Sequence, residues 1–263
     1  MRLPVVLTIA GSDSGGGAGI QADIKAFHSL GVHGACAITS ITSQNTKGVE
    51  GRYDLPESVV ISQIKAVLGD LKPAAVKTGM LANAAIVRAV AAILAEYGAC
   101  NLVVDPVVFS SGGQPLLDEG GLEAMVECLF PLAAVVTPNL EEAAALLGGE
   151  VSDVRDVREA ARRIREMGPA CVVLKGGHLA PEAEVTDIFC DGKNIIELSL
   201  PRVRTVNDHG TGCVFSAAVA ARLARGEETL AAVAGAKRDV TRALESSLSL
   251  GGGRGPVHPL PEC

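Results

Sequence analysis

The chain has 263 residues, of which 48% are hydrophobic, and a formal net charge of −7. This length and apolar share suffice for one large core, so we expect a single α/β domain and not two full domains. The negative charge argues against general affinity for nucleic acids or anionic membranes, because either would need a basic face, and any bound phosphate must therefore be held locally.

Short apolar runs rich in β-branched residues alternate with longer helical patterns. This alternation predicts a mostly parallel sheet with helices on both faces. In chain order, the predicted strands are Val5 to Ala10, Ala35 to Ile41, Ala74 to Lys77, Leu102 to Asp105, Ala134 to Thr137 and Cys171 to Lys175. The predicted helices are Ile20 to Leu30, Glu57 to Leu68, Asn83 to Tyr97, Leu122 to Phe130, Leu140 to Leu147, Val154 to Met167, Cys213 to Arg225 and Glu227 to Ser246. Glycines just past helix ends predict left-handed C-terminal residues at Gly31, Gly98, Gly148, Gly168 and Gly226.

The end of the chain differs in composition from the rest. We expect residues 1–248 to form one domain and residues 249–263, with three consecutive glycines and three prolines, to form an irregular tail. No further domain is expected beyond Cys263. The seven cysteines show no C-x-x-C pair and no zinc-finger spacing, which favours reduced thiols and a cytoplasmic protein. The apolar run after Pro4 is too short for a signal-peptide core or a membrane span.

Polar residues or glycines follow almost every predicted strand directly. In an open parallel sheet these positions share one edge, where ligands bind, so one cleft can collect them. The segments are Gly11-Ser12-Asp13, Thr42 to Asn45, Thr78-Gly79-Met80, Asp105-Pro106, Pro138-Asn139 and Gly176-Gly177-His178.

The first of these segments continues as a glycine-rich loop from Gly11 to Gly19, with five glycines in nine residues. It contains no G-x-G-x-x-G pattern, and the dipeptide Gly192-Lys193 lacks the Walker A pattern. The sequence therefore supports neither a Rossmann oxidoreductase nor a P-loop NTPase. A flexible surface turn is the alternative, but so many glycines favour close approach of backbone to a ligand.

A second glycine-rich turn, from Asn207 to Cys213, leads directly into an apolar helical stretch from Val214 to Leu223. Such a turn leaves backbone N–H groups free at the positive end of the helix dipole, which predicts an anion site. We expect the same helix terminus to lower the thiol pKa of Cys213, so that an anion and a proton acceptor share one space, as phosphoryl transfer requires. The alternative is an ordinary helix start with a cysteine that packs as a small hydrophobe.

Six blocks, taken in order along residues 4–246, point to one family. They are Gly11 to Asp23, Gln44-Asn45-Thr46, Val104-Asp105-Pro106-Val107, Thr137-Pro138-Asn139, Lys175-Gly176-Gly177-His178 and His209-Gly210-Thr211-Gly212-Cys213. Together they resemble the hydroxymethylpyrimidine/phosphomethylpyrimidine kinases of thiamin biosynthesis, within the ribokinase-like superfamily. The resemblance implies an α/β fold, a ribokinase-like three-layer α/β/α sandwich with a mostly parallel central sheet. It also implies a kinase that uses ATP and Mg²⁺ to phosphorylate 4-amino-5-hydroxymethyl-2-methylpyrimidine and then its monophosphate.

At the substrate end, the resemblance implies contacts from Gly11, Ala18, Asp23, Gln44, Met80 and Val107. The Asp23 carboxylate would contact the aminopyrimidine, and the Gln44 amide would hydrogen-bond it. Met80 and Val107 would enclose the flat ring, because the chain has no Trp and only seven Phe and Tyr residues. Without the resemblance, the simpler interpretations are a solvated helix carboxylate, a structural turn residue and two core side chains.

At the nucleotide end, the resemblance implies contacts from Asn139, Lys175, Thr211, Gly212 and Lys237, and a magnesium environment formed by Asp105 and Glu142. Lys175 ends an apolar strand, where its charge is costly unless the ammonium reaches the cleft. Lys237 could equally be a solvated helix lysine. Glu142 could be a carboxylate that only interacts with the helix dipole.

The expected reaction is in-line attack of the substrate hydroxyl on the γ-phosphate of ATP. Mg²⁺, Lys175 and the N–H groups of Gly210, Gly212 and Cys213 would stabilise the charge on the transferred oxygens. Cys213 would accept the hydroxyl proton or orient the hydroxyl. Many ribokinase-like enzymes have an aspartate at this position, so the cysteine favours the pyrimidine kinases over the sugar kinases.

Two other functions stay open: a pyridoxal or pyridoxine kinase, and a non-catalytic sensor of a vitamin precursor. The presence of the phosphoryl-transfer groups argues against the sensor. We expect the pyrimidine and ATP as partners, and no nucleic acid or membrane. The resemblance implies a homodimer, to which Gln44 to Pro56 would contribute contacts or a lid. His178 and His209 are interpreted as polar loop residues without a catalytic role.

Overall fold

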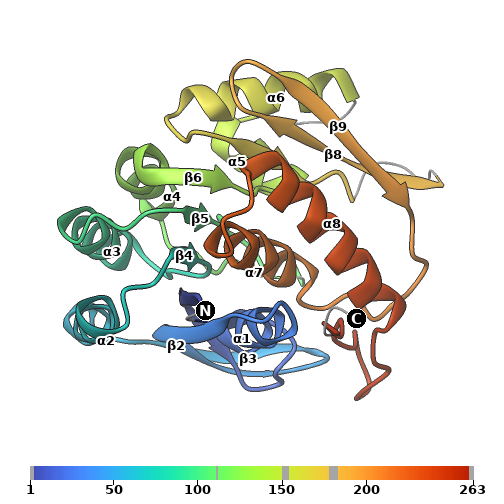
Figure 1. The fold of residues 1–263 in the computed structure, drawn as a ribbon. Helices are drawn as coiled ribbons and strands as arrows, with labels where there is room; N and C mark the ends of the chain where they lie inside the picture. Colours follow the sequence, from blue (N-terminus) through green and yellow to red (C-terminus); the bar gives the residue numbers. More distant parts are fainter. Residues whose placement is uncertain (1–2, 111, 150–153, 178–182, 261–263) are drawn as a thin grey trace.

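Nine strands form one sheet in the computed structural model of the chain, which describes residues 3–110, 112–149, 154–177 and 183–260 (Figure 1). The strand order across the sheet is β3-β2-β1-β4-β5-β6-β7-β8-β9. The strands are β1 (Val5–Asp13), β2 (His33–Asn45), β3 (Gly48–Asp54), β4 (Ala75–Thr78), β5 (Leu102–Val104), β6 (Ala133–Val136), β7 (Val172–Leu174), β8 (Glu184–Cys190) and β9 (Ile195–Pro201). The α-helices are α1 (Gly19–Ser29), α2 (Glu57–Asp70), α3 (Ala84–Glu96), α4 (Gly121–Ala124), α5 (Leu140–Leu147), α6 (Val154–Glu166), α7 (Thr211–Ala224) and α8 (Thr229–Glu245).

The inner part of the sheet is parallel, as the alternation of strands and helices predicts. Strands β2, β1, β4, β5, β6 and β7 pair in parallel, whereas β3 on one side and β8 and β9 on the other pair antiparallel. The carboxyl ends of the parallel strands therefore meet along one edge, where an open α/β sheet binds ligands.

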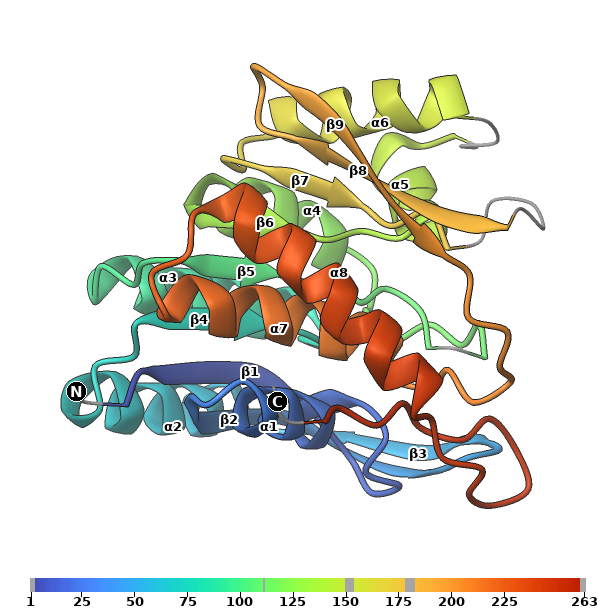
Figure 2. The same ribbon diagram turned by 45° about the vertical axis from the view of Figure 1, so that its right-hand side comes forward.

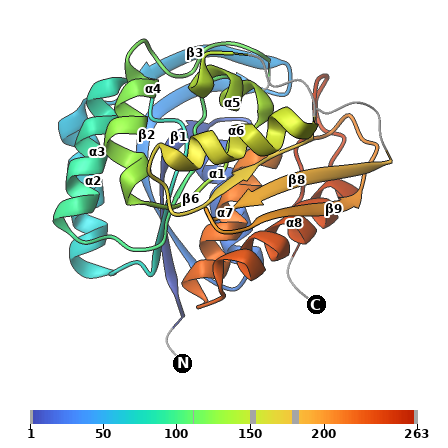
Figure 3. The same cartoon turned by 90° about the horizontal axis from the view of Figure 1, so that it is seen from above.

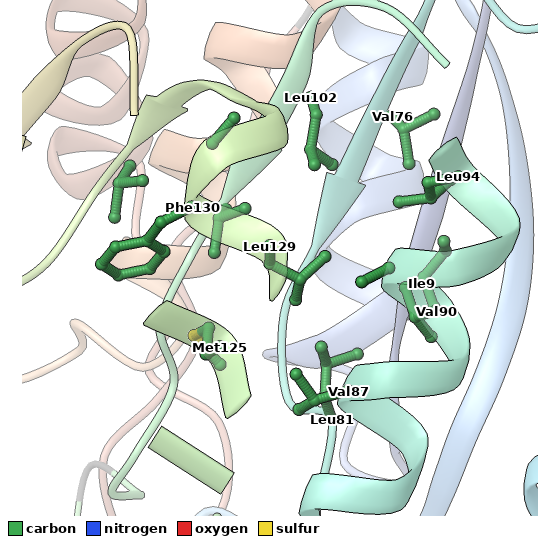
Figure 4. Packing of buried hydrophobic residues seen from close by; sticks show 14 of the residues in the cluster. Ile9, Val76, Leu81, Val87, Val90, Leu94, Leu102, Met125, Leu129 and Phe130 are labelled. Atoms are coloured by element: carbon green, nitrogen blue, oxygen red, sulfur yellow. The ribbon is translucent and has the colours of Figure 1, made fainter. Parts of the chain in front are cut away.

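Helices cover both faces of the sheet and complete a three-layer α/β/α sandwich (Figures 2 and 3). One core lies under α1, α7 and α8, and a second lies under α2, α3, α5 and α6. Figure 4 shows part of the second core, in which Leu102 of β5, Val90 of α3 and Leu129 gather on one face of the sheet. No helix of the described residues is long and apolar enough to cross a membrane.

The helix expected from Leu122 to Phe130 is not a regular α-helix, so this prediction is wrong in type. One α-helical turn, α4, passes into a π-helical turn at Met125–Leu129 and a 3₁₀ turn at Phe130–Leu132. Pro131 contributes to this change because it has no N–H to donate and its fixed φ does not suit an α-helix interior.

Three strands were missed in the sequence, and all three lie at the antiparallel ends of the sheet. Strand β3 has the sequence GVEGRYD, whose glycines and charges hide a strand pattern. Strand β9, with the sequence IIELSLP, alternates apolar and polar residues from its second residue onward, which is a period-two signal typical of a half-buried strand. Strands β1 and β2 also run further toward the cleft than predicted, to Asp13 and Asn45.

The predicted positions just past the helix ends are confirmed by their backbone angles. All five glycines, Gly31, Gly98, Gly148, Gly168 and Gly226, have positive φ. Residues 249–260 form turns and an isolated bridge, with no helix or strand among them.

Candidate active site

A cavity of about 600 Å³ opens at the edge where the parallel strands end. Its wall combines residues of β1 and β2, the segments after β4, β5, β6 and β7, and the first turn of α7. Residues far apart in the sequence therefore meet in one cleft, as the sheet topology requires.

The turn before α7 contributes free backbone donors to the wall of this cavity. Gly210 precedes the helix with φ of 85°, and a Cβ on it would lie 1.8 Å from the Gly17 carbonyl oxygen, so only glycine fits. The backbone N–H and the hydroxyl of Thr211 both donate to the carbonyl of Asp208, at 3.2 and 2.6 Å. The N–H groups of the next two residues lie in the first helical turn, where they have no helical acceptor and can bind an anion.

Lys175 and Asp105 face each other beside this turn. Lys175 Nζ lies 3.0 Å from Asp105 Oδ1, and the hydroxyls of Thr137 and Ser216 donate to the same carboxylate at 3.1 Å each. A Cβ on Gly212 would lie 3.4 Å from Lys175 Nζ, so the ammonium borders the anion turn. The two residues thus place one positive and one negative charge next to the proposed phosphate position.

The charge of Lys175 is maintained although the side chain is mostly buried. Burial alone would lower the pKa of Lys175, but the carboxylates of Asp105 and Glu142 outweigh burial and raise the pKa above its ordinary value. Lys175 is therefore an ammonium near neutral pH and can bind a phosphate oxygen.

Glu142 and Asn139 form a capping box at the start of α5. The Asn139 side chain accepts from the Glu142 N–H and the Glu142 side chain accepts from the Asn139 N–H, both at 2.8 Å. Burial raises the pKa of Glu142 to about 7, although the Lys175 ammonium and the Asn139 N–H favour the ionised form. Glu142 therefore titrates in the physiological range while it lines the cavity.

The donor chemistry around Asp105 and Glu142 fits Mg²⁺. This ion prefers oxygen ligands and typically takes one or two carboxylates together with substrate phosphates and water. Within the described ranges, no group of three or more His, Cys, Asp or Glu side chains could hold a metal ion by itself. A magnesium ion here would therefore need phosphate oxygens of the nucleotide as further ligands.

Lys237 lies in the cavity wall but is not a free cation. Its Nζ lies 2.7 Å from Asp187 Oδ2, both side chains are mostly buried, and the other oxygen of Asp187 accepts from the Gly176 N–H at 3.0 Å. The solvated-lysine interpretation is therefore wrong. Asp187, which the sequence reading missed, ties α8 to β8 and to the segment after β7.

The predicted acceptor residues other than Asp23 all line the same cavity: Gly11, Ala18, Gln44, Met80 and Val107. A Cβ on Gly11 would lie 2.4 Å from Met80 Cε, so the glycine leaves room for the Met80 side chain. Ala18 precedes α1, and its N–H donates to Asp13 Oδ2 at 2.8 Å.

Asp23 does not line the cavity, so the direct contact expected for its carboxylate is not supported by its position. The side chain is fully buried; it lies 2.8 Å from Lys77 Nζ and accepts from the Thr8 hydroxyl at 2.6 Å. Lys77, which the sequence reading missed, lines the cavity instead. Burial alone would lower the pKa of Lys77, but the neighbouring acidic groups, Asp23 foremost and Asp105 among the others, together outweigh burial and raise the pKa.

Cys213 lines the cavity, but its thiol is not acidified as expected from the helix terminus. Burial raises the pKa of Cys213 to about 11, and the carboxylates of Asp23 and Asp105 act in the same direction. The Lys77 ammonium and a hydrogen bond from the Gly19 N–H oppose this rise without cancelling it. The expectation of a lowered pKa is therefore wrong, and the resting residue is a neutral thiol.

His209 is more closely integrated into the site than a loop residue. Its Nε2 lies 3.0 Å from Asp13 Oδ2 and 3.2 Å from the Gln44 amide nitrogen. Because a carboxylate only accepts, Nε2 donates to Asp13, which leaves the Gln44 N–H groups for another acceptor such as a ring nitrogen. His178 lies outside the described residues.

Asp13 organises the glycine-rich loop around its carboxylate. It accepts from the N–H groups of Gly15, Gly17 and Ala18 at 2.8 to 3.0 Å. Burial alone would raise the pKa of Asp13, but the hydrogen bonds from His209, Ala18 and Gly15 outweigh burial and hold the pKa below its ordinary value. The spacing of Asp13 before consecutive glycines is typical of a loop closed by a side chain and could have indicated this role.

Comparison with known proteins gives a consistent result. A family model described as phosphomethylpyrimidine kinase matches residues 13–258. The hydroxymethylpyrimidine/phosphomethylpyrimidine kinase of Streptomyces coelicolor is 47% identical over 254 residues, which cover 97% of this chain and 93% of that protein. The thiamine biosynthesis bifunctional protein of Geobacter sulfurreducens is also 47% identical, over 96% of this chain, but the match spans only 51% of that longer protein.

The fold is also similar to solved structures. The ADP complex of Bacillus subtilis pyridoxal kinase superimposes with a TM-score of 0.90 at 36% identity, over 98% of both chains. A kinase of a different vitamin therefore shares the whole architecture, so the fold alone does not distinguish between the two acceptors.

Proposed function

The chain belongs to the phosphomethylpyrimidine kinase family, and from this membership we propose that it transfers the γ-phosphoryl group of ATP to 4-amino-5-hydroxymethyl-2-methylpyrimidine and then to the resulting monophosphate. The diphosphate would serve thiamin biosynthesis. The observation that carries the proposal is a single cavity with the anion turn at Gly210 to Cys213 and the predicted ring contacts Gln44, Met80 and Val107 in its wall.

The nucleotide end of the cavity supports ATP as the phosphoryl donor. We propose that Lys175 and Lys237 contact the phosphates and that Asn139 contacts the nucleotide. Gly212 would contribute its backbone N–H, and Thr211 would contribute its hydroxyl by turning it from the Asp208 carbonyl to a phosphate oxygen. To bind a phosphate, Lys237 must share its ammonium with Asp187, and a Lys ammonium with three donors can do so.

Magnesium would neutralise negative charge on the nucleotide phosphates when it is bound. Asp105 and Glu142 would hold it, the latter through water. Glu142, with a pKa of about 7, would lose its proton on binding a cation, because a nearby positive charge favours the carboxylate.

The acceptor end would hold the flat ring between Met80 and Val107. The free N–H groups of the Gln44 amide would donate to a ring nitrogen, because His209 Nε2 gives its proton to Asp13 and cannot accept from them. This arrangement would aim the hydroxymethyl group at the anion turn.

Catalysis would rest on donors that are fixed before substrate arrives. The N–H groups of Gly210, Gly212 and Cys213, together with Lys175, would stabilise the oxygens of the transferred phosphoryl group. The thiol of Cys213 is neutral at rest and keeps its own proton, so in this form it would orient the substrate hydroxyl. Only its thiolate, formed by loss of the thiol proton to solvent, could accept the hydroxyl proton as the hydroxyl oxygen bonds to phosphorus, and this transfer would regenerate the thiol. Lys77, within electrostatic reach, would stabilise that thiolate.

Measurement of ADP release distinguishes the proposed kinase from the two alternatives, a non-catalytic sensor and a pyridoxal kinase. A sensor would bind the pyrimidine without releasing ADP, so calorimetric titration combined with an ADP-release assay distinguishes it from a kinase. The proposal expects ADP release in stoichiometric proportion to phosphorylated pyrimidine. Binding without release would contradict it, and a pyridoxal kinase would release ADP only with pyridoxal or pyridoxine.

We also propose a cytoplasmic location, a homodimer and one functional domain over residues 1–248, to which residues 251–257 are tied by backbone hydrogen bonds at Thr46 and His209. The cysteines of the described ranges are free thiols, which fits a reducing compartment.

The proposed dimer surface lies on the β2–β3 hairpin. Ile41 and Tyr53 pair across β2 and β3 and are 50% and 66% exposed, so the hairpin offers an apolar surface to a second copy. Sedimentation equilibrium of the wild type and of Tyr53→Glu tests the dimer, because the charge at this surface should shift the population to monomer.

A further inference from the structure

The C-terminal segment from Gly251 to Val257 lies against the active site although it forms no helix or strand. We call this segment the C-terminal strap. It bonds to two separate loops, the tip of the β2–β3 hairpin at Thr46 and the loop before α7 at Asn207 to His209. Figure 2 shows the dark red strap beside β3.

On the hairpin side, the strap donates two backbone hydrogen bonds to one residue. Gly253 N–H donates to Thr46 Oγ1 at 3.2 Å, and Arg254 N–H donates to the Thr46 carbonyl at 2.9 Å. Thr46 comes two residues after Gln44, the proposed acceptor contact, so the strap holds the chain directly beyond the acceptor end of the cavity.

On the phosphate side, the strap pairs with the residue that precedes the anion turn. His209 N–H donates to the Gly255 carbonyl and Val257 N–H donates to the His209 carbonyl, both at 3.1 Å, which forms a short parallel bridge. Gly255 N–H also donates to Asn207 Oδ1 at 3.1 Å. Because Gly210 follows His209 directly, this bridge fixes the start of the turn.

Arg254 adds a side-chain clamp to the same loop. Its Nε and a terminal nitrogen donate to the two oxygens of Asp208 at 2.8 and 2.6 Å, a bidentate pair that only arginine can form. The Asp208 carbonyl in turn accepts both the N–H and the hydroxyl of Thr211. Arg254 therefore acts on the anion turn through Asp208, and it lines the cavity itself.

Most glycines of the strap lie where its backbone comes closest to neighbouring groups. A Cβ on Gly253 would lie 2.0 Å from the Thr46 carbonyl oxygen, and one on Gly255 would lie 2.0 Å from the Leu248 carbonyl oxygen. By contrast, a Cβ on Gly252 would meet only the flexible end of Lys47, at 3.1 Å. Gly251 is also constrained, since its φ is 69° and a Cβ on it would lie 2.3 Å from Thr46 Oγ1. Three glycines of the strap thus allow close approach to neighbouring groups, while Gly252 is not required for it.

We propose that the C-terminal strap is a positioning element of the kinase site and that Arg254 is its positioning residue. The strap sets the anion turn, where phosphate is transferred, in register with Gln44, where the acceptor ring binds. The proposal rests on the proposed function, because it assumes phosphoryl transfer at the Gly210 turn. A misplacement of about 1 Å caused far from the reacting atoms can cost about 100-fold in rate, so the strap has a measurable effect on kcat.

The test uses the full-length chain and three single alanine variants, Gly252→Ala, Gly253→Ala and Gly255→Ala. We expect kcat to fall by about 10- to 100-fold for Gly253→Ala and Gly255→Ala, because the clash moves the turn relative to the hairpin. The KM for ATP should change less than kcat, since Lys175, Lys237 and Asn139 lie outside the displaced turn. Gly252→Ala should behave as the wild type, which makes it the matched control.

Thermal unfolding separates positioning from loss of fold. The two impaired variants should keep Tm within about 4 °C of the wild type, so that assays at 25 °C measure folded protein. Arg254→Lys, which retains the charge but not the bidentate pair, should recover part of the kcat that Arg254→Met loses. A C-terminal segment that only stabilised the fold would not show this partial recovery of kcat.

Three outcomes would overturn the proposal: wild-type kcat in Gly253→Ala and Gly255→Ala, equal losses in Gly252→Ala, or losses that follow the unfolded fraction alone. These outcomes differ from failure of the proposed function, in which the wild type itself would release no ADP with the pyrimidine. If the wild type instead turned over pyridoxal, the same variants would test the strap with that acceptor.

Discussion

Lys77 Nζ lies 2.8 and 3.0 Å from the two carboxylate oxygens of Asp23, and neither side chain is exposed to solvent. A buried ion pair of this kind is weak evidence for stability, because desolvation of both charges offsets their attraction. The position of the ion pair indicates a role in the site instead, because Lys77 lines the cavity and the Lys77 charge acts on Cys213. Asp23 thus holds the lysine in place and has no direct contact with the cavity.

Asp23→Asn should destabilise the fold as well as impair turnover. The substitution leaves the Lys77 ammonium buried without its counter-charge, which typically costs about 3–5 kcal/mol. We expect the free energy of unfolding, measured by urea titration, to fall by that amount. A simple substrate contact would instead raise the KM for the pyrimidine and leave the unfolding free energy unchanged.

The double variant Asp23→Leu/Lys77→Met serves as the control for this prediction. Replacement of a whole buried pair by apolar residues is often neutral or stabilising, so the double variant should unfold at a higher urea concentration than Asp23→Asn. It should still lack turnover. Recovery of turnover in the double variant would contradict a role for the Lys77 charge.

Lys77→Met should make the Cys213 thiol less reactive. The pKa of Cys213 is about 11 with the Lys77 ammonium in place, and removal of that positive charge raises it further. Since the thiolate is the reactive form, each unit of increase lowers the alkylation rate about tenfold at a fixed pH well below the pKa. Iodoacetamide labelling of Cys213 at pH 9, followed by mass spectrometry, measures this rate.

Cys213→Ala controls this experiment, because it should abolish labelling at this site and most turnover while it leaves the fold intact. Proton-transfer groups typically contribute about 10²- to 10⁴-fold to the rate. Wild-type kcat in Cys213→Ala would exclude Cys213 both as the group that orients the hydroxyl and, in its thiolate form, as the proton acceptor. An unchanged labelling rate in Lys77→Met would exclude the electrostatic coupling between Lys77 and Cys213.

Glu142 should make the protein less stable as the pH rises through neutrality. Its pKa is raised from 4.5 to about 7 in the fold, so the folded state binds the extra proton between these values. The contribution is fully present below pH 4.5 and is lost as the pH rises through 7, by at most about 3 kcal/mol. Urea titrations at pH 5.5 and pH 8.5 measure the difference.

Glu142→Gln should remove this pH-dependent loss and keep the capping box, because glutamine still offers an oxygen to the Asn139 N–H. Glu141→Gln is the matched control, since Glu141 is the adjacent exposed residue on the same helix turn. An identical pH dependence in the wild type and Glu142→Gln would show that Glu142 is ionised throughout the range.

The two glycines of the anion turn should respond differently to alanine. Gly210→Ala places a Cβ 1.8 Å from the Gly17 carbonyl oxygen at a φ of 85°, so both the Tm and the turnover should fall. A Cβ on Gly212 would reach only 3.4 Å from Lys175 Nζ, so Gly212→Ala should fold normally and lose kcat through a crowded phosphate site. Equal Tm losses in both variants would contradict this distinction.

Much of the architecture follows from patterns that are local in the sequence. The apolar runs predict the parallel strands, and the glycines near Gly15 and Gly210 predict loops that approach a ligand. Strands β3 and β8 were missed because their pairing partners, and not their composition, decide their conformation, whereas the period-two alternation of β9 could have indicated a strand.

Side-chain partners were harder to predict than backbone positions. Helical periodicity places Asp23 on α1 but does not show that it faces Lys77 across the sheet. Lys77 could have indicated the ion pair, because a charged residue in the apolar run Ala74 to Thr78 requires a partner, just as Lys175 does. The Cys213 pKa depends on a balance between burial, three neighbouring charged groups and a backbone hydrogen bond from Gly19, and that balance has no local signature.

The most direct test of the central claim is a product-resolved assay with ATP and, in turn, hydroxymethylpyrimidine, its monophosphate, pyridoxal, pyridoxine and ribose. The proposed function predicts that the pyrimidine alcohol is converted to the monophosphate and then to the diphosphate, with kcat/KM for both steps above that for pyridoxal. Phosphorylation of pyridoxal or pyridoxine alone, with neither pyrimidine consumed, would contradict it.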